Sequence, residues 1–325
     1  MVYIIFLIAA VIVVLAAVQL NKYGDIISKK SVLSGAAVGT FLIAGATSLP
    51  ELTTSLTAVY IDNPDIAVGN MIGSNVFNLL ILAVVDIVYR RRRLFQRVGR
   101  KHHLNSAVIG LVYMAIVIFA LLNPISFEIL GVGVEMLFIV AIYIVMTKFL
   151  SNSEEEEEAA PAAEEKKSGK DYKLKKAVIR FILFALLVFA AGSVLAVSGD
   201  RLAQVSGLNA SFVGSFLIAA STSLPELVTV LAAFKMANYG MAVGSILGSN
   251  LFNMQLLAIT DVAFRDGAVL AAADTSHAYM AGLGSFMTLV VIYLLFRPKI
   301  SSNWRYALPS LVVGAVYIVT SFLLF

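Results

Sequence analysis

The sequence predicts an all-α membrane protein of ten transmembrane helices, arranged as two inverted-topology repeats of five helices. The first observation is composition: 60% of the 325 residues are hydrophobic and 14% are charged, whereas about a quarter of the residues in a soluble domain are charged. The second is that apolar runs of about 20 residues, long enough to cross a bilayer, recur along the chain. The third is that a long segment occurs twice, at a constant separation of 175 positions.

The apolar runs place the expected helices in order. Most connections between them are short, and the exception is 150–176, where five consecutive glutamates, a proline and several lysines are typical of a solvated linker. This linker separates a first repeat, 1–149, from a second repeat, 177–325. The ten expected spans are 2–19, 36–60, 66–88, 105–122, 129–149, 177–198, 211–236, 241–264, 278–296 and 306–324.

The distribution of basic residues orients these helices in the membrane. With the N-terminus outside, 22 of the 24 lysines and arginines fall on the cytoplasmic side, and only Arg201 and Arg265 fall outside. Cytoplasmic loops of membrane proteins carry this excess of positive charge. We therefore expect an integral protein of a prokaryotic cell membrane, with both termini extracellular and the central loop cytoplasmic. The basic cluster 90–101 fits anionic lipid and needs no nucleic-acid partner.

The repeat indicates how the two halves are related. Residues 38–90 align without a gap on residues 213–265, with 28 identities in 53 positions. The second and seventh spans are five membrane crossings apart, so the two copies must run in opposite directions through the bilayer. Inverted repeats with polar, interrupted helices are typical of secondary transporters whose site lies near the middle of the membrane. We expect the segments 38–90 and 213–265 to build that site together.

Each copy places a glutamate inside an apolar run, Glu51 in the first and Glu226 in the second. An ionisable side chain at this depth is costly and by default marks a functional site. Thr47 and Ser48 precede Glu51 by four and three residues, which puts them on its face of the helix. Pro50 removes a backbone hydrogen bond, so the carbonyl one turn earlier is available as a ligand. The second copy repeats the arrangement with Thr222, Ser223 and Pro225.

The next helix of each copy supplies a second polar face. Ser74 and Asn78 are four residues apart in GNMIGSNVFN, and Ser249 and Asn253 hold the same positions in GSILGSNLFN. Glycines four residues apart in these motifs let another backbone come close. The two helices can therefore bring hydroxyl and amide oxygens to the glutamates, although helix packing alone also accounts for such residues.

The expected cluster contains two carboxylates with hydroxyl, amide and backbone oxygens, and no sulfur or histidine. Oxygen-only sites suit hard cations such as Ca²⁺, Na⁺ and Mg²⁺. Two glutamates balance one divalent ion, and when the site is empty they repel each other and favour protonation of one of them. The pair should therefore cross the membrane only when Ca²⁺, several Na⁺ or protons compensate its charge.

Two further carboxylates sit near helix ends. Asp86 and Asp261 precede Arg90 and Arg265 by four residues, so we expect ion pairs along the helix at the two membrane surfaces. The alternative is that each aspartate lies in the access path of the ion.

These residues resemble the sodium/calcium exchanger family of the cation/calcium exchanger superfamily. The resemblance rests on TSLPE at 47–51 and 222–226 and on GSNxxN at 73–78 and 248–253. It implies an antiporter in which Glu51 and Glu226 bind Ca²⁺ and share Na⁺, with no prosthetic group. It also implies that helices 1 and 6 slide against the rest as a gating pair. The other ligands it implies are backbone oxygens at Thr47 and Thr222, the hydroxyls of Ser48, Ser223, Ser74 and Ser249, and carbonyls near Ala44 and Ala219.

Several alternatives stay open beside Na⁺/Ca²⁺ exchange. Asn253 stands where some relatives, including the potassium-dependent branch, carry an aspartate, so potassium coupling is not expected and H⁺ is the alternative coupling ion. Another divalent metal is the alternative cargo. A passive channel is disfavoured because this chain supplies both halves of the site itself, and a hydrolase because the sequence has no H-E-x-x-H motif. We expect a transporter and not an enzyme, with lipid and ions as partners and no obligatory protein partner.

Overall fold

The computed structural model describes residues 1–325 except 31–44, 124–126, 130, 155–173 and 324–325. The described chain is almost entirely helical, and its one departure from the all-α expectation is a short antiparallel ribbon that pairs Glu128 with Gly133. The elements are α1 (Val2–Lys30), α3 (Leu49–Tyr60), α4 (Pro64–Val88), η1 (Leu94–Gln96), α5 (Arg100–Leu122), β1 (Glu128–Ile129), β2 (Val132–Gly133), α6 (Val134–Glu154), α7 (Leu174–Ser206), α8 (Ala210–Phe212), η2 (Val213–Ile218), α9 (Ala219–Thr222), α10 (Leu224–Lys235), α11 (Tyr239–Ala263), α12 (Val269–Ala272), α13 (His277–Phe296) and α14 (Asn303–Leu323).

Eight helices of the described residues are long and apolar enough to cross a membrane, and Val134–Met146 is a shorter apolar helix. The chain is therefore a multi-pass membrane protein. The count of ten stays a prediction, because the first part of the expected span 36–60 lies outside the described residues. Two helices reach into the expected linker 150–176, because α6 continues to Glu154 and α7 begins at Leu174.

The helices are sorted by how much of their surface they bury. In the apolar stretch that is long enough to cross the membrane, 72% is buried in α4 and 67% in α11, but only 22% in α14. The outer helices expose large apolar side chains such as Leu7, Leu183 and Phe322, as expected for a surface that faces lipid. Most polar residues of α4 and α11, by contrast, are buried inside the bundle. The interior is therefore more polar than the rim.

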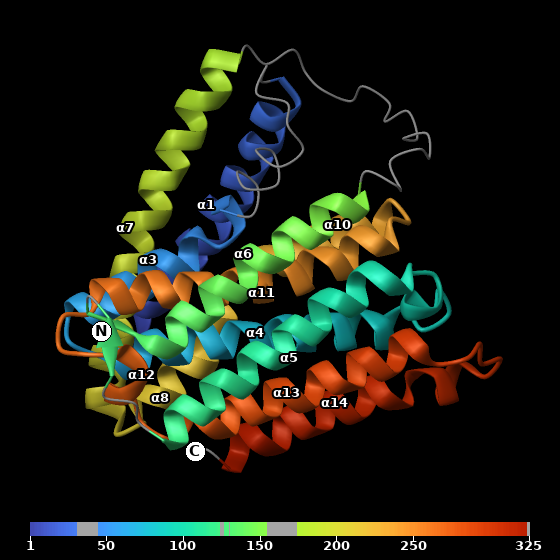
Figure 1. The fold of residues 1–325 in the computed structure, drawn as a ribbon. Coiled ribbons are helices and arrows are strands. Elements are labelled where there is room, and N and C mark those ends of the chain that lie inside the picture. Colours follow the sequence, from blue (N-terminus) through green and yellow to red (C-terminus); the bar gives the residue numbers. More distant parts are fainter. Residues whose placement is uncertain (31–44, 124–126, 130, 155–173, 324–325) are drawn as a thin grey trace.

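The helices α1 and α7 pack against each other and tilt away from the rest of the bundle (Figure 1, upper part). The ring of Tyr23 stacks on that of Phe184 with centroids 5.8 Å apart. Polar contacts join this pair to α3, including Thr57 Oγ1 to Ser193 Oγ at 2.9 Å. The two expected gating helices are thus paired in the fold, and their sliding stays a prediction.

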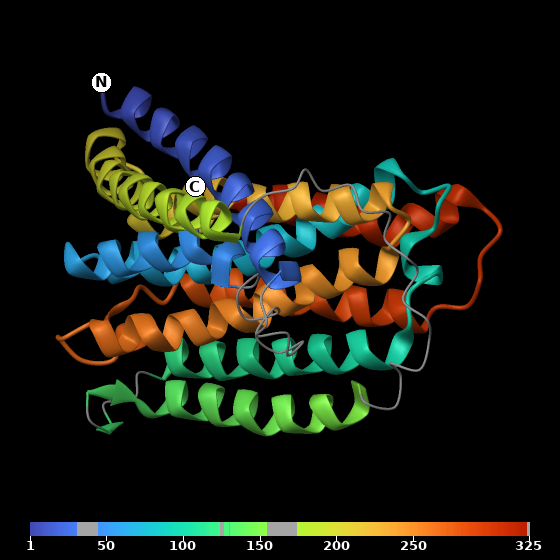
Figure 2. The same ribbon diagram turned by 90° about the horizontal axis from the view of Figure 1, so that it is seen from above.

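The helices run roughly side by side, so the loops gather at two ends (Figure 2). At the end that we call basic, Arg93 bonds Ser301 and Asn303, and the guanidinium of Arg97 lies 5.5 Å from the ring centroid of Tyr239. The end that we call acidic joins loops through four carboxylates, those of Asp65, Glu128, Asp261 and Asp200.

Candidate ion-binding site

Both copies of the repeat interrupt their helix at the same residue. Ser48 has φ −97° and ψ 10°, and Ser223 has φ −90° and ψ 0°. A new helix then begins, with the proline at its second position. Proline fits the first turn of a helix, where its missing N–H costs nothing, and does not fit the helix interior. The sequence predicted only a lost backbone hydrogen bond within the spans 36–60 and 211–236, whereas the structure interrupts the helix at Ser48 and Ser223. The break aims the first turns of α3 and α10, which carry the glutamates, into the bundle.

The two glutamates are buried, with Glu51 1% and Glu226 3% exposed. The hydroxyl of Ser223 lies 3.5 Å from Glu51 Oε1, so residues of the two halves meet here. Oε2 of each glutamate is buried and has no hydrogen-bond partner among the described residues. The two carboxylates lie close enough for the charge of Glu51 to act on Glu226. Buried carboxylate oxygens without donors are a costly arrangement that a bound cation would relieve.

Thr222 joins the second copy to α4 of the first. Its Oγ1 lies 3.3 Å from Ser74 Oγ, 3.2 Å from Asn70 Oδ1 and 3.2 Å from the carbonyl of Ala219. A hydroxyl has a single proton to donate, so only one of these acceptors is served at a time. The predicted residues Ser74, Thr222 and Ala219 are therefore brought together.

Asn70 belongs to this cluster and was not among the predicted ligands. Its amide donates to the carbonyl of Glu51 at 3.1 Å and to Ser55 Oγ at 2.9 Å. Comparison of the two copies did not indicate Asn70, because the matching position of the second half is Ser245. Helical spacing carried the signal: Asn70 is four residues before Ser74 and so shares its face.

Four asparagines form a symmetric clasp between α4 and α11. Asn75 Nδ2 donates to the carbonyl of Asn250, and Asn250 Nδ2 donates to the carbonyl of Asn75, both at 3.1 Å. Asn78 Nδ2 donates to Asn250 Oδ1 at 2.9 Å, and Asn253 Nδ2 donates to Asn75 Oδ1 at 3.0 Å. The bonds leave Oδ1 of both Asn78 and Asn253 buried without a described partner. The clasp thus joins the two halves of the chain through α4 and α11.

The glycines of α4 allow the closest backbone contact of the site. A Cβ at Gly73 would lie 2.2 Å from the carbonyl oxygen of Ser215, and one at Gly69 would lie 3.0 Å from Ser215 N. Ser215 belongs to η2, a π-helical turn, and such turns are frequent at functional sites. The predicted close approach is confirmed for α4. In α11, Gly248 has no described atom within 4 Å of a Cβ.

The remaining predicted ligands are only partly described. Thr47 and Ser48 are buried, and Ser48 Oγ has no hydrogen-bond partner among the described residues. Ser249 is 9% exposed on α11. Ala44 lies outside the described residues.

The expected ion pair between Asp86 and Arg90 is wrong. The carboxylate of Asp86 is fully buried and accepts hydrogen bonds from Tyr306 and Ser310 of α14, each at 2.6 Å. The guanidinium of Arg90 instead lies 4.7 Å from the ring centroid of Trp304. A carboxylate facing inward finds hydroxyls on the neighbouring helix, whereas the arginine reaches past the end of the helix.

The expected pair between Asp261 and Arg265 is also wrong. Asp261 is fully buried and accepts from two backbone N–H groups, Val269 at 2.6 Å and Gly133 at 2.8 Å. The helix α11 ends at Ala263, two residues before the arginine, so the i to i+4 spacing is not helical there. Asp86 therefore joins α4 to α14, and Asp261 joins the end of α11 to the backbone of Val269 and Gly133.

Comparison with known proteins agrees with this architecture. A family model described as sodium/calcium exchanger protein matches residues 1–150 and 176–323. The uncharacterised membrane protein MJ0091 of Methanocaldococcus jannaschii is 30% identical over 223 residues, or 67% of each chain. The sodium/calcium exchanger MaX1 of Methanosarcina acetivorans is 26% identical over 282 residues, 78% of this chain and 81% of the relative.

Two solved structures show the same fold at lower identity. The sodium–calcium exchanger NCX_Mj superposes with a TM-score of 0.58 at 22% identity, covering 98% of this chain and 97% of that one. The H⁺/Ca²⁺ exchanger CAX superposes with a TM-score of 0.65 at 14% identity, covering 99% of this chain and 90% of that one. Because the family model spans nearly all of both halves, the chain belongs to the sodium/calcium exchanger family of membrane transporters.

Proposed function

We propose that the chain is a secondary antiporter that exchanges Na⁺ for Ca²⁺ at a site built on Glu51 and Glu226. The observation that carries the proposal is the pair of buried Oε2 atoms, one from each half, that have no hydrogen-bond partner among the described residues. Amide oxygens of Asn78 and Asn253 in the same state lie on the neighbouring helices. Such an oxygen-only set suits a hard cation.

The ligand set we propose follows the two copies. Ca²⁺ would be held mainly by the two glutamates, whose combined charge balances one divalent ion. Hydroxyl and carbonyl oxygens would complete the Ca²⁺ and Na⁺ positions: those of Thr47, Thr222, Ser48, Ser223, Ser74, Ser249, Ala44 and Ala219. Because the empty pair is self-repelling, the protein would change sides only when loaded. That requirement is what makes an exchanger and not a channel.

Alternating access would rest on two inverted repeats of five helices each. Two features 175 positions apart support this symmetry. Asn63 and Asn238 cap α4 and α11 in the same way, accepting from Ile66 N at 3.1 Å and Met241 N at 3.0 Å. The asparagine clasp shows the same symmetry, because Asn75 and Asn250, which exchange hydrogen bonds, lie 175 positions apart. The paired helices α1 and α7 would then move against the remainder.

The orientation we propose puts the basic end in the cytoplasm, with both termini outside. The arginines of 90–97 and 297–305 gather at that end, and positive charge is retained on the cytoplasmic side of membranes. The acidic end would then face outward, where it meets external Na⁺ or Ca²⁺ first.

A second candidate is H⁺/Ca²⁺ exchange by the same site. The observation in its favour is the likeness of the fold to the H⁺/Ca²⁺ exchanger CAX, whose TM-score of 0.65 exceeds the 0.58 of NCX_Mj. Two close buried carboxylates can also exchange one Ca²⁺ for protons, since neutralisation by protons meets the same charge requirement.

Uptake of ⁴⁵Ca²⁺ into proteoliposomes separates these functions. Vesicles loaded with Na⁺ are compared with vesicles loaded with K⁺ and with vesicles given a pH gradient. Uptake that needs an outward Na⁺ gradient is the expected result. Uptake driven by the pH gradient alone would replace Na⁺ by H⁺ as the coupling ion. Ca²⁺ flux with no counter-ion gradient would indicate a channel, and no Ca²⁺ uptake under any gradient would overturn the proposal.

A further inference from the structure

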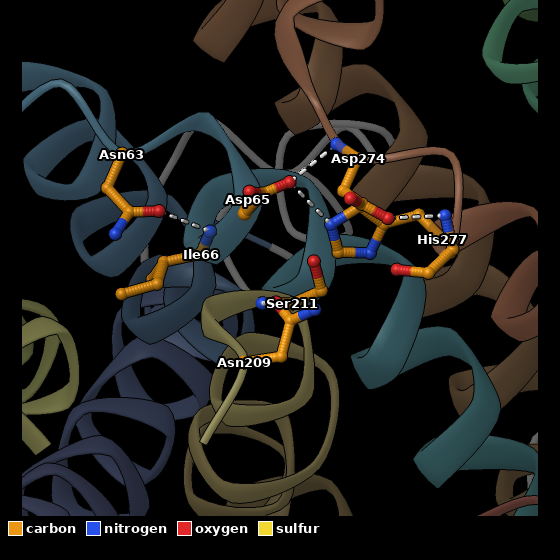
Figure 3. Close-up of polar contacts among 8 residues, drawn as sticks. Asn63, Asp65, Ile66, Asn209, Ser211, Asp274 and His277 are labelled. Carbon is orange, nitrogen blue, oxygen red and sulfur yellow. Dashed lines mark hydrogen bonds and ion pairs between the residues drawn. The ribbon is translucent and has the colours of Figure 1, made fainter. Parts of the chain in front are cut away.

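A buried histidine lies at the acidic end, away from the glutamates. His277, the first residue of α13, is fully buried, and its Nε2 lies 3.2 Å from Asp65 Oδ1 at the start of α4. The same oxygen accepts the backbone N–H of Asp274 at 2.6 Å. Figure 3 shows Asp65 between the imidazole ring and the Asp274 backbone. One carboxylate thus fixes both the ring and the turn that precedes its helix.

This geometry sets the tautomer of the neutral ring. An ionised carboxylate is only an acceptor, so Nε2 must carry the proton that points to Asp65, and Nδ1 then presents a lone pair. Nδ1 is buried and has no hydrogen-bond partner among the described residues. A lone pair in this state is free to accept a proton.

A cavity gives the Nδ1 lone pair access to water and to protons. A pocket of about 50 Å³ is lined by His277 with Asn209, Ser211, Ser215 and the apolar residues around them. Ser215 Oγ is also buried without a described partner. A polar pocket of this size has room for water, which can hydrogen-bond to both groups and deliver a proton.

The pocket adjoins the backbone crossing described above. A Cβ on Gly69 would lie 3.0 Å from both His277 Cε1 and Ser215 Oγ, so ring, glycine and η2 are in contact. The segment η2 continues directly into α9, which holds the proposed ligands Ala219 and Thr222. A charge placed on His277 therefore acts at the start of the helix that leads to the site.

The second half of the chain offers a comparison at the other end. Gly244 matches Gly69 at the repeat separation, and a Cβ there would lie 3.1 Å from Cε1 of His103, on α5. Each half of the chain therefore places one histidine against the first glycine of the other half's motif. The aspartate is not repeated: Gly240 stands at the position that matches Asp65. The carboxylate partner is thus specific to the acidic end.

Few other charges surround His277. Asp65 on α4 and Asp274 in the preceding turn are the nearby ionisable groups, and Asp274 Oδ1 accepts the N–H of Ser276. The segment 210–218 borders the same pocket, and 104–122 and 308–323 belong to α5 and α14, which pack against α13. These three segments contain no Asp, Glu, Lys or Arg, and Tyr113 and Tyr317 are their only tyrosines. A proton on Nδ1 would therefore change the local charge without a competing cation.

We infer that His277, held by Asp65, is a proton-binding site at the acidic end that opposes the access of cations from that side. When the ring is uncharged, an arriving ion passes a lone pair and water. The protonated ring cancels the negative charge of Asp65, so the pair no longer attracts the ion, and the lone pair is occupied by the proton. The effect on transport rests on the proposed function, whereas proton binding by His277 does not.

The transport test uses oriented proteoliposomes with the acidic end facing the bath. The half-saturating Ca²⁺ concentration in the bath is measured from about pH 8 to about pH 5, the range in which histidine changes charge, at constant internal pH. For the native protein we expect this concentration to rise by about fivefold or more toward acid pH, the lower limit of typical coupling between linked sites. In His277→Gln, which keeps a donor for Asp65, the part of the rise that depends on the ring should be lost, so that only proton competition at the glutamates remains. The matched control His103→Gln should retain the native bath-pH dependence.

A second measurement does not depend on transport or on the fold of the His277 variant. The sequence has three histidines, so the double variant His102→Gln, His103→Gln leaves His277 alone for ¹⁵N NMR of the ring. The proposal requires that Nδ1 gain a proton as the bath is taken across the pH range of the transport test. A ring that keeps one protonation state over this range would overturn the proton site. A His277→Gln protein that keeps the native bath-pH dependence would overturn its role in access. If the native protein carries no Ca²⁺, the proposed exchange fails, and the NMR titration alone decides on proton binding.

Discussion

The two halves of the molecule share a backbone plan but differ in the side chains that surround it. Both break a helix at a serine, Ser48 or Ser223, with nearly the same torsion angles. The halves differ among the residues around these breaks, where Asn70 of the first copy corresponds to Ser245 of the second. Asn70 bonds Glu51 and Ser55, but Ser245 only bonds a carbonyl of its own helix, that of Ala242 at 3.1 Å. The repeat therefore fixes the geometry of the centre, and single substitutions around it give each half its own support.

The largest expected effect tests whether the two halves contribute equally at the centre. Glu51→Gln or Glu226→Gln removes one of the two charges that balance Ca²⁺, and the charge of the ligands strongly tunes Ca²⁺ affinity. Each variant should lose Ca²⁺ transport by about 100-fold or more, equivalent to about 2.7 kcal/mol. The measurement is initial ⁴⁵Ca²⁺ uptake, with monodispersity in detergent as the check on folding.

Glu128→Gln is the matched control for that comparison, because Glu128 is exposed at the acidic end. It should transport at close to the native rate. Native uptake by a folded Glu51 or Glu226 variant would show that the halves are not equivalent and would remove that glutamate from the site.

The next effect tests the close approach of α4 and η2. Gly73→Ala puts a methyl group 2.2 Å from the carbonyl oxygen of Ser215, a backbone atom that cannot turn aside. Overpacking of this kind costs about 1 to 3 kcal/mol or more, so we expect a lower yield of folded protein and a lower melting temperature. Gly282→Ala, where no described atom lies within 4 Å of a Cβ, should melt like the native protein. Equal melting of both variants would mean that the helices separate freely at Gly73.

Much of this centre could be predicted from the sequence, because it depends on local rules. A proline removes a backbone hydrogen bond from a helix, and repeated glycines permit a close approach, so the disturbed helices at Pro50 and Pro225 and the close contact at Gly73 follow from local rules. Proline alone does not fix the outcome, because Pro309 lies inside the continuous helix α14. Asn70 was missed because it is not repeated, although its helical face could have indicated it.

The partners of the two outer aspartates could not be predicted, because they depend on tertiary contacts. The spacing of Asp86 from Arg90 is a local signal, whereas Tyr306 and Ser310 lie more than 200 positions away. Likewise, nothing local links Asp261 to the N–H of Gly133. Local electrostatics gave the wrong pair in both cases, since a buried carboxylate is better satisfied by short hydrogen bonds from fixed donors.

A smaller effect is expected on stability, and it should differ between the two aspartates. Asp261→Asn keeps one acceptor oxygen but turns an amide donor toward one of two backbone N–H groups, Val269 or Gly133. A backbone donor cannot reverse its role, so one N–H is left unsatisfied, at a cost of about 1 to 3 kcal/mol. We expect a measurable fall in thermal stability with transport retained below the melting range. Asp266→Asn, an exposed change in the neighbouring loop, should leave the melting temperature unchanged.

The smallest effect is expected for Asp86→Asn, because its partners are hydroxyls. Tyr306 accepts the N–H of Phe95 at 3.2 Å and donates to Oδ1, a bond that the asparagine oxygen can keep. Ser310 can rotate its proton away and accept from the new amide. The loss of stability should therefore stay below about 1 kcal/mol, within the range of single polar contacts between membrane helices. Thermal melting and ⁴⁵Ca²⁺ uptake measured together decide the question. A folded Asp86→Asn protein that carries no Ca²⁺ would show that this carboxylate lies in the path of the ion, and a variant as unstable as Asp261→Asn would show that Ser310 is not free to reverse its hydrogen bond.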